Sequence, residues 1–356
     1  MSYDKNVKGA LTAAGFLQSA GAYFLVDGQY GSTGKGLAAG LLAEIYPFNV
    51  DVVISNAGPN SGHTSYFGEH KFVLRQLPTF TVVASQLGAT PITYLNGGAV
   101  IDPKVLNEEI YSYTFHRNMR VVVHPSAACV TDEALEMDVS NVARIGSTGK
   151  GTGPALMLKM MRQGLGSVVG GNMDKIAADV GFFLPKRDHV SLVEVSQGFS
   201  LGINSGFYPH TTSRECTVSQ ALADAQLHPS FCRDTMMVVR AYPIRVAGNS
   251  GPCYPDQKEI TWDELGVPPE ITTVTKKVRR VFTWSDDQFL TACYHNRPGV
   301  IMLNFVNYLV QNGHCVDTFV RERVLKNYIR VLGSYPKAIL LGYGPCAADV
   351  KLWVPQ

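Results

Sequence analysis

Short apolar runs alternate with amphipathic stretches along this chain, and that alternation predicts its elements. Buried strands are expected in five short runs: 22–27, 51–55, 121–125, 237–246 and 338–345. Helices are expected in four stretches: 37–46, 154–164 with Pro154 at its first position, 287–296 and 319–332. Strands alternating with helices favour an α/β fold with a mostly parallel central sheet flanked by helices. We expect a single large domain spanning residues 1–356.

The composition narrows the class of partner. Apolar residues make up 46% of the 356 residues and charged residues 17%, which is enough to build a sizeable core. The net charge of +2 argues against a general binder of nucleic acid polymers but leaves small anionic ligands open. No run of about 18 consecutive apolar residues occurs, so no membrane span is expected. Seven scattered cysteines without a C-x-x-C pair indicate a reducing cytoplasm.

The hexapeptide GSTGKG occurs twice, at 31–36 and at 146–151. The first copy lies between a predicted strand and the start of a predicted helix, where backbone amides of a glycine-rich loop can surround an anion. Lys35 adds a point charge suited to phosphate. The loop is a variant P-loop, because Gln29 stands where the usual motif has its first glycine and Gly36 where it has Ser or Thr. The alternative is a glycine-rich turn without a ligand.

A second candidate loop for an active site is NAGPNSGHT at 56–64, which follows the next predicted strand. It brings Asn60, Gly62 and His63 together at a strand end, where sites of α/β proteins are usually built. A lone histidine is more often structural, but this position favours a role in the site.

In several blocks the chain resembles the adenylosuccinate synthetase family. The family's G-x-Q-W-G-D-E-G-K-G is matched by D-G-Q-Y-G-S-T-G-K-G at 27–36, and its N-A-G-H-T by N-S-G-H-T at 60–64. Its G-T-T-G-R-G-I-G-P is matched at 146–154, E-G-A-Q-G at 194–198, Y-P-Y-V-T-S at 208–213, T-T-G-R-P-R-R more loosely at 274–280, and the terminal G-P at Gly344 and Pro345. These blocks run in order across nearly the whole chain.

The resemblance implies a reason for two phosphate cradles. Family members use a nucleoside triphosphate to phosphorylate O6 of a 6-oxopurine monophosphate, and the amine of aspartate then displaces that phosphate, so two phosphate-bearing ligands are held together. The implied triphosphate-binding residues are Gly31, Ser32, Thr33, Gly34, Lys35, Gly36, Gly62, His63, Thr64, Asn307, Gly344 and Pro345. The implied Mg²⁺ ligands are Ser32 and Gly62, and the implied catalytic residues are Ser32, His63 and Gln197.

The remaining roles carried over by position concern the monophosphate and aspartate. The implied monophosphate-binding residues are Asn60, Ser147, Thr148, Arg162, Gln197 and Thr212. The implied aspartate-binding residues are Thr275, Lys277 and Arg279, in a basic loop that also includes Arg280. Arg162 matches an arginine that reaches the neighbouring subunit's monophosphate, which implies a homodimer with shared active sites; an exposed helical arginine is the alternative. Lys277 replaces a family arginine, so the two parallel hydrogen bonds that a guanidinium can donate to a carboxylate are lost there.

The chain departs from the family at Ser32, where the family has an aspartate that takes the purine N1 proton and helps to hold Mg²⁺. A serine hydroxyl is a poor general base and a weaker metal ligand. Three hypotheses follow: an inactive relative, a conventional synthetase of IMP and GTP with another base, or a changed substrate. We favour the third, because a smaller uncharged residue beside N1 leaves room for the 2-amino group of guanine. The group that removes the N1 proton stays open, with water or a substrate phosphate as candidates.

In this respect the chain resembles a viral branch of the family that joins L-aspartate to dGMP and makes the succinyl precursor of a 2-aminoadenine deoxynucleotide. Its setting would then be the host cytoplasm.

A second departure lies at 304–307, where the family has T-K-L-D and its Asp reads guanine in GTP. Asn307 replaces that Asp, and an amide suits adenine N1 and N6, so we expect ATP or dATP. The alternatives are that Asn307 never touches the base, and that the chain is a nucleotide-binding regulator.

Overall fold

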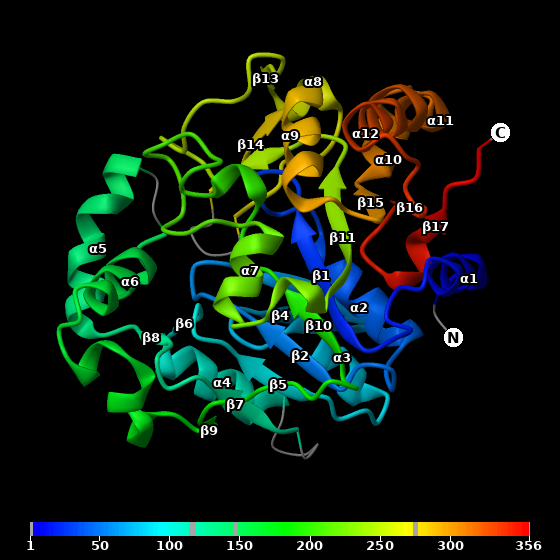
Figure 1. The fold of residues 1–356 in the computed structure, drawn as a ribbon. Coiled ribbons are helices and arrows are strands. Elements are labelled where there is room, and N and C mark those ends of the chain that lie inside the picture. The colour runs from blue at the N-terminus through cyan, green and yellow to red at the C-terminus, as the bar shows by residue number, and fades with distance from the viewer. Residues whose placement is uncertain (1–2, 114–118, 146–147, 273–276, 356) are drawn as a thin grey trace.

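The computed structural model describes residues 3–113, 119–145, 148–272 and 277–355. Within them, one large sheet runs through the molecule with helices on both faces (Figure 1). Its strands are, in spatial order, β17 (Val350–Leu352), β16 (Ala338–Gly342), β15 (Val300–Asn304), β11 (Cys232–Arg240), β1 (Gly21–Asp27), β10 (Val190–Glu194), β2 (Val52–Ser55), β5 (Ile92–Leu95), β7 (Val121–Val123) and β9 (Asp179–Val180). Among the described residues, neighbouring strands of this sheet run parallel except β16 and β17, which are antiparallel. The mostly parallel α/β fold predicted from the sequence is confirmed.

The central strands read as uninterrupted apolar runs because both faces of the sheet are covered. All seven residues of β1 are buried, and its alternate side chains enter different cores. Tyr23 and Leu25 pack into one apolar cluster, while Phe24 and Val26 pack into the other. The two cores hold the sheet rigidly, so the loops at its carboxyl edge start from fixed positions.

The helices follow the predicted alternation. The helix predicted at 37–46 is α2 (Lys35–Ile45), that at 287–296 is α9 (Asp286–Asn296), and that at 319–332 comprises the end of α11 (Val316–Phe319), a π-helical stretch (Val320–Leu325) and α12 (Lys326–Leu332). The remaining helices are α1 (Lys5–Ala13), α3 (Thr79–Gln86), α4 (Pro103–Tyr113), α5 (Asp132–Ile145), α6 (Thr152–Met160), α7 (Val218–Asp224), α8 (Trp262–Leu265) and α10 (Val306–Gln311). The smaller sheets pair β3 (His63–Phe67) with β4 (His70–Leu74), β6 (Val100–Ile101) with β8 (Ala128–Cys129), and join β12 (Ile244–Arg245), β14 (Arg280–Phe282) and β13 (Glu259–Ile260).

Two predicted elements need correction. The strand expected at 237–246 is two strands: β11 ends at Arg240, and β12 belongs to the three-stranded sheet. Pro243 lies between them and has no N–H to continue the ladder. The helix expected at 154–164 is α6, which begins earlier at Thr152 and ends at Met160, so Pro154 is its third residue.

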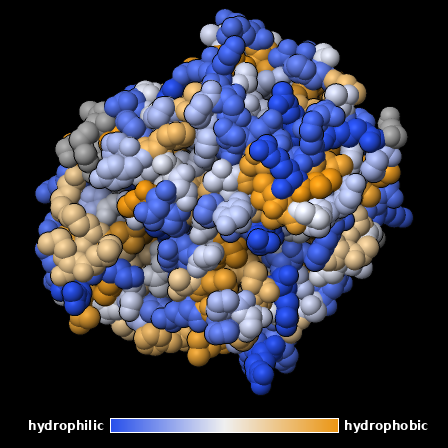
Figure 2. All heavy atoms as spheres, turned by 45° about the horizontal axis from the view of Figure 1, so that its top comes forward, coloured by the Kyte–Doolittle hydropathy of each residue, from blue (hydrophilic) through white to orange (hydrophobic). Residues whose placement is uncertain are grey.

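The surface is mixed in character. Figure 2 shows charged and polar residues interspersed with apolar ones on the face it presents. Among the described residues no helix has the length and apolar character needed to cross a membrane. All seven cysteines lie in the described part of the chain and are free thiols, and Cys315, at the start of α11, is the exposed one among them.

Candidate active site

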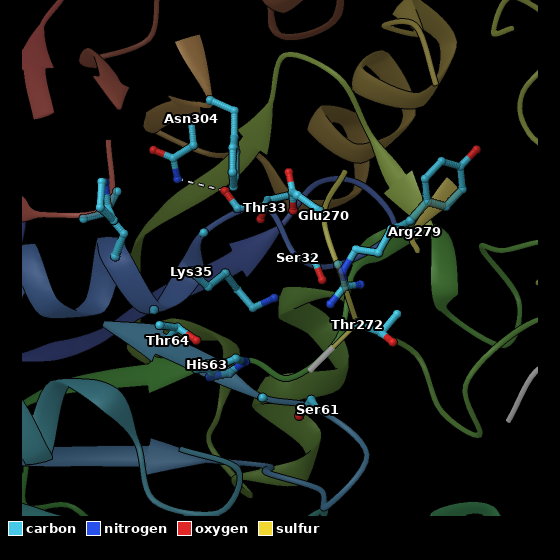
Figure 3. A pocket seen from close by; sticks show the side chains of 18 of the residues that line it. Ser32, Thr33, Lys35, Ser61, His63, Thr64, Glu270, Thr272, Arg279 and Asn304 are labelled. Carbon is cyan, nitrogen blue, oxygen red and sulfur yellow. Dashed lines mark hydrogen bonds between the residues drawn. The ribbon is translucent and has the colours of Figure 1, made fainter. Parts of the chain in front are cut away.

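A pocket of about 510 Å³ opens at the carboxyl edge of the large sheet (Figure 3). Most of its wall comes from segments that follow four parallel strands: 28–36 after β1, 56–62 after β2, 195–201 after β10, and 305–308 after β15. The first of these segments ends in the first turn of α2, and the last lies mostly in α10. Parallel strands place their carboxyl ends at one edge, so residues far apart in sequence converge there. Glu270, Thr272 and Arg279 line the pocket from a further segment.

The first glycine-rich loop is organised by the carboxylate of Asp27, the last residue of β1. Its Oδ1 accepts hydrogen bonds from the backbone amides of Gln29 at 2.8 Å and Gly31 at 3.2 Å. Its Oδ2 accepts from Thr33 Oγ1 at 2.6 Å and from Lys35 Nζ at 3.1 Å. Because Asp27 is 1% exposed, these donors replace the water that the charge has lost.

Two glycines of this loop are required by close contacts. Gly34 has φ +95°, and a Cβ there would lie 2.4 Å from Asn304 Nδ2, the amide that donates to Thr33 O at 2.8 Å. Figure 3 shows this last hydrogen bond across the top of the pocket. A Cβ on Gly36 would lie 2.2 Å from the carbonyl oxygen of Thr64. Any side chain at either position would therefore push the loop away from its neighbours.

Lys35 connects the first loop with residues expected to bind the monophosphate. Its Nζ donates to the carbonyl of Gln197 at 2.6 Å, and Gln197 Nε2 donates to Asn60 Oδ1 at 3.0 Å. Gln197 and Asn60 both line the pocket. The expected triphosphate and monophosphate sites therefore share a continuous chain of hydrogen bonds.

His63 begins β3, directly after Gly62, and points into the pocket near Lys35 (Figure 3). Burial and, to a smaller extent, the positive charge of Lys35 lower the pKa of His63 to about 3. The imidazole is therefore neutral at physiological pH, with one N–H to donate and one nitrogen to accept.

Ser32 presents a small exposed side chain to the pocket, with a left-handed backbone at φ 55°. Its carbonyl accepts from Arg240 Nη1 at 3.1 Å. Arg240 is 0% exposed, forms an ion pair with Glu270, and lies over the ring of Phe305 at 3.7 Å from the centroid. The loop that carries Ser32 is thus fixed from behind by a buried cation.

Glu270 supplies the one carboxylate among the described residues that line the pocket. Burial raises its pKa, but the charge and hydrogen bonds of Arg240 outweigh burial and lower the pKa overall. Tyr308 donates to the same carboxylate at 3.2 Å. The sequence analysis missed Glu270, Arg240 and Tyr308; a charged residue inside an apolar predicted strand was the available signal for Arg240.

The structure brings most predicted site residues together. The pocket is lined by Gly31, Ser32, Thr33, Gly34, Lys35, Gly36, Asn60, Gly62, His63, Thr64, Thr148, Gln197, Arg279, Asn307, Gly344 and Pro345. Arg162 and Lys277 are exposed outside the pocket wall, and Thr212 is half-buried behind it, donating its amide to the carbonyl of the wall residue Leu201 at 2.7 Å. Ser147 and Thr275 lie outside the described residues.

The donor set suits a metal that stays bound to phosphate. Among the described residues no group of three or more His, Cys, Asp or Glu side chains is placed to hold a metal ion. Ser32 and Gly62 both line the pocket, and they carry a hydroxyl and a carbonyl oxygen respectively. Mg²⁺ in nucleotide sites takes a few protein oxygens and completes its shell with phosphates and water, so these residues fit it.

Comparisons with known proteins agree with this geometry. The sequence pattern of the family described as adenylosuccinate synthetase matches residues 24–180 and 169–309. The N6-succino-2-amino-2'-deoxyadenylate synthase of Salmonella phage PMBT28 is 36% identical over 363 residues, covering 93% of this chain and 97% of the relative. The enzyme of the same name from Vibrio phage phiVC8 is 35% identical over 354 residues, covering 92% and 97%.

Two solved structures resemble the whole chain. The Cyanophage S-2L succinoaminodeoxyadenylate synthetase, bound to dGMP and to dATP as an energy donor, superposes with a TM-score of 0.80 at 30% identity, covering 94% of this chain and 96% of that one. The fully ligated adenylosuccinate synthetase of Plasmodium falciparum superposes with a TM-score of 0.70 at 20% identity, covering 93% and 99%. The second likeness concerns the fold alone.

Proposed function

This chain belongs to the adenylosuccinate synthetase family, and on that premise we propose that it is a ligase that joins L-aspartate to C6 of dGMP. ATP or dATP drives the reaction, and the products are succinyl-2-amino-deoxyadenylate, the nucleoside diphosphate and phosphate. The observation that carries the choice of substrate is Ser32, which stands in the pocket where the family motif has an aspartate.

The pocket wall supports guanine over hypoxanthine. Guanine carries a 2-amino group beside N1, and Ser32 offers a small hydroxyl that can accept from it. An aspartate in the same place would add bulk and charge. Glu270 is the carboxylate among the described pocket residues. Its oxygens already form an ion pair with Arg240 and accept a hydrogen bond from Tyr308. The site therefore favours a base that brings an additional N–H₂ group.

The order of bond changes is the one that the family resemblance implies. The γ-phosphoryl group moves to O6 of dGMP as its bond to the β-phosphate breaks and the N1 proton passes to water or a substrate phosphate. The aspartate amine then loses a proton and forms the C6–N bond as the C6–O bond breaks and the O6 phosphate leaves. Lys35 supplies positive charge to the transferring group, and the neutral His63 N–H can donate to oxygen where negative charge develops. Mg²⁺, when bound, neutralises phosphate charge, with the Ser32 hydroxyl and Gly62 carbonyl as its protein oxygens. Arg279, which lines the pocket, holds the aspartate carboxylates, and the family resemblance adds Lys277 and Thr275 to this role.

The end of β15 supports an adenine nucleotide as phosphate donor. Phe305 and Asn307 both line the pocket there, in place of the Lys and Asp of the family motif. An amide offers adenine N1 a donor and adenine N6 an acceptor, whereas guanine N1–H and N2–H₂ need two acceptors.

The surface around Arg162 supports a homodimer. Arg162 lies just beyond α6 and is exposed, and it is flanked in sequence by exposed apolar side chains: Met157, Met160, Met161 and Leu165. Val139, also exposed, lies on α5, which contacts α6. In Figure 2 apolar residues gather on the side where α5 and α6 lie in Figure 1. Exposed apolar side chains beside an exposed arginine suit burial against a second copy, whose monophosphate would pair with the guanidinium.

The test is mass spectrometry of the product after incubation with dGMP or IMP, aspartate, Mg²⁺ and ATP or GTP. We expect the succinyl adduct of dGMP. Consumption of IMP but not dGMP would identify a conventional synthetase, and no phosphate release with any combination would identify a non-catalytic relative.

Two variants of Ser32 separate its size from its hydroxyl. Ser32→Asp should impair dGMP turnover through bulk and charge, and Ser32→Ala, which adds neither, should retain far more of it. Unchanged dGMP turnover in Ser32→Asp would remove Ser32 as the selectivity element.

A further inference from the structure

The most deeply placed charge of the first loop is Asp27, which does not itself line the pocket. Four donors of the loop converge on it: the amides of Gln29 and Gly31, the hydroxyl of Thr33 and the ammonium of Lys35. Neither the motif comparison nor the proposed mechanism gives this carboxylate a role. Its contact with Lys35 indicates a role in positioning that side chain.

The family motif explains where the carboxylate came from. Position by position, G-x-Q-W-G-D-E-G-K-G has glycine where this chain has Asp27 and glutamate where it has Thr33. In the structure these two positions touch, because Thr33 Oγ1 donates to Asp27 Oδ2 at 2.6 Å. We infer that the loop carboxylate has moved from position 33 to position 27, and that Asp27 is the positioning residue for Lys35.

The contacts of Lys35 show what the moved carboxylate does. Its ammonium is 3.1 Å from Asp27 Oδ2 and donates at 2.6 Å to the carbonyl of Gln197. Asp27 therefore holds the lysine at the floor of the triphosphate cradle and against the backbone of a residue that binds Asn60 on the monophosphate side. This step rests on the proposed function, in which Lys35 meets the triphosphate.

The exchange also changes which charges face the ligands. Thr33 lines the pocket, whereas Asp27 lies beneath the loop. With the carboxylate at position 27, the negative charge lies beneath the pocket wall, where donors of the loop itself satisfy it. Together with Ser32 in place of aspartate, this removes both motif carboxylates from the loop's side of the pocket.

Reversing the exchange tests the inference. Asp27→Gly leaves Lys35 and Thr33 without their acceptor, and Thr33→Glu forces two carboxylates together. Each single variant should lower kcat/KM for the triphosphate by about tenfold or more, while the KM for dGMP changes less than about threefold. The double variant Asp27→Gly/Thr33→Glu restores one carboxylate beside Lys35 and should recover to within about threefold of the parent, a non-additivity expected of coupled neighbours.

A second Asp–Lys pair, formed by a buried aspartate and an exposed lysine, provides the control. Asp234 lies near the amino end of β11, whereas the pocket lies at the carboxyl edge of the sheet. It accepts hydrogen bonds from Lys337 Nζ at 2.9 Å and from the backbone amide of Gly299 at 3.1 Å. Asp234→Asn and Asp27→Asn should both lower the Tm, but Asp234→Asn should leave the triphosphate KM unchanged. Only Asp27→Asn should raise that KM.

The outcomes separate this inference from the proposed function. The Tm of the two single variants and the double variant can be measured without any substrate, and recovery of Tm in the double variant would support the exchange even if dGMP proved not to be the substrate. Losses of Tm and kcat/KM in the double variant equal to the sum of the single effects would overturn it. The inference would also be overturned if Asp27→Asn, like Asp234→Asn, left the triphosphate KM unchanged.

Discussion

Three pocket residues other than glycine have left-handed backbones: Ser32 at φ 55°, Gln197 at φ 67° and Phe305 at φ 58°. Such conformations cost free energy for residues with a Cβ and persist where surrounding contacts enforce them. Each lies in a segment that leaves the carboxyl end of a sheet strand. The strain turns the chain sharply at the strand end and keeps these residues at the pocket wall.

His63 should contribute mainly to the chemical step. In the proposed function its neutral imidazole donates where charge develops, and loss of one such donor costs roughly 3–4 kcal/mol, or on the order of 10²–10³ in rate. His63→Ala should therefore lower kcat by that factor with a near-normal Tm. His70→Ala, on the exposed end of β4, is the matched control and should be neutral. A loss below tenfold in His63→Ala would assign it a structural role.

Asn307 should set the phosphate donor. Asn307→Asp restores the carboxylate that pairs with two guanine N–H groups and should move the ratio of kcat/KM values toward GTP by about tenfold or more, which corresponds to ~1.4 kcal/mol. ATP, dATP and GTP should be compared in the parent and the variant. Asn312→Asp, at the exposed end of α10, should leave the ratio unchanged. A parent that already prefers GTP would contradict the assignment.

The sequence predicted residues that carry local signals better than residues that act through tertiary contacts. The glycine-rich loop and His63 stand in recognisable patterns directly after apolar runs. Glu270 has no such pattern, because its place depends on Arg240, 30 residues earlier in the sequence. Asp27 reads as the end of a strand, and only the folded loop shows four donors around it.

At the scale of elements, the strands predicted at 22–27, 51–55 and 338–345 were found because a strand buried on both faces must be apolar throughout. The strand predicted at 237–246 was too long, because Ile244 and Arg245 pair with another sheet after Pro243. Helix α5 (Asp132–Ile145) was missed although it is amphipathic, with Ala134 and Asp138 buried and Glu133 and Glu136 exposed.

The segment after α6 should complete a neighbouring subunit's site. Arg162→Leu should raise the KM for dGMP far more than the KM for the triphosphate, because the guanidinium is expected to pair with the monophosphate. Arg187→Leu, an exposed arginine in the loop before β10, is the control and should change neither value. Mixing Arg162→Leu with His63→Ala should restore some activity, since hybrid dimers contain one intact site. Absence of recovery, or a monomer in sedimentation, would contradict the shared site.

For the whole molecule, a buried carboxyl predicts how stability depends on pH. Burial in α2 raises the pKa of Glu44 to about 7. The folded state therefore binds more protons than the unfolded state between about pH 4.5 and 7, and the contribution of Glu44 to stability falls as pH rises through that window. Glu44→Gln should stabilise the protein at pH 8 by about 1–3 kcal/mol and have little effect at pH 4.5.

Thermal unfolding at both pH values checks this expectation. Glu108→Gln, on the exposed face of α4, should behave alike at pH 4.5 and pH 8. A gain in Tm for Glu44→Gln that is equal at the two pH values would show that ionisation of Glu44 is not its cause.

The exposure of Cys315 makes the molecule suited to site-specific fluorescent labelling. Hydrogen bonds with Thr318 lower the pKa of its thiol, whereas burial raises the pKa of Cys129 to about 11 and of Cys216 to about 12. A maleimide dye at neutral pH should therefore attach first at Cys315. The dye would stand four residues after the end of α10, the helix that carries Asn307, so its emission can report nucleotide arrival in real time on the unmutated chain.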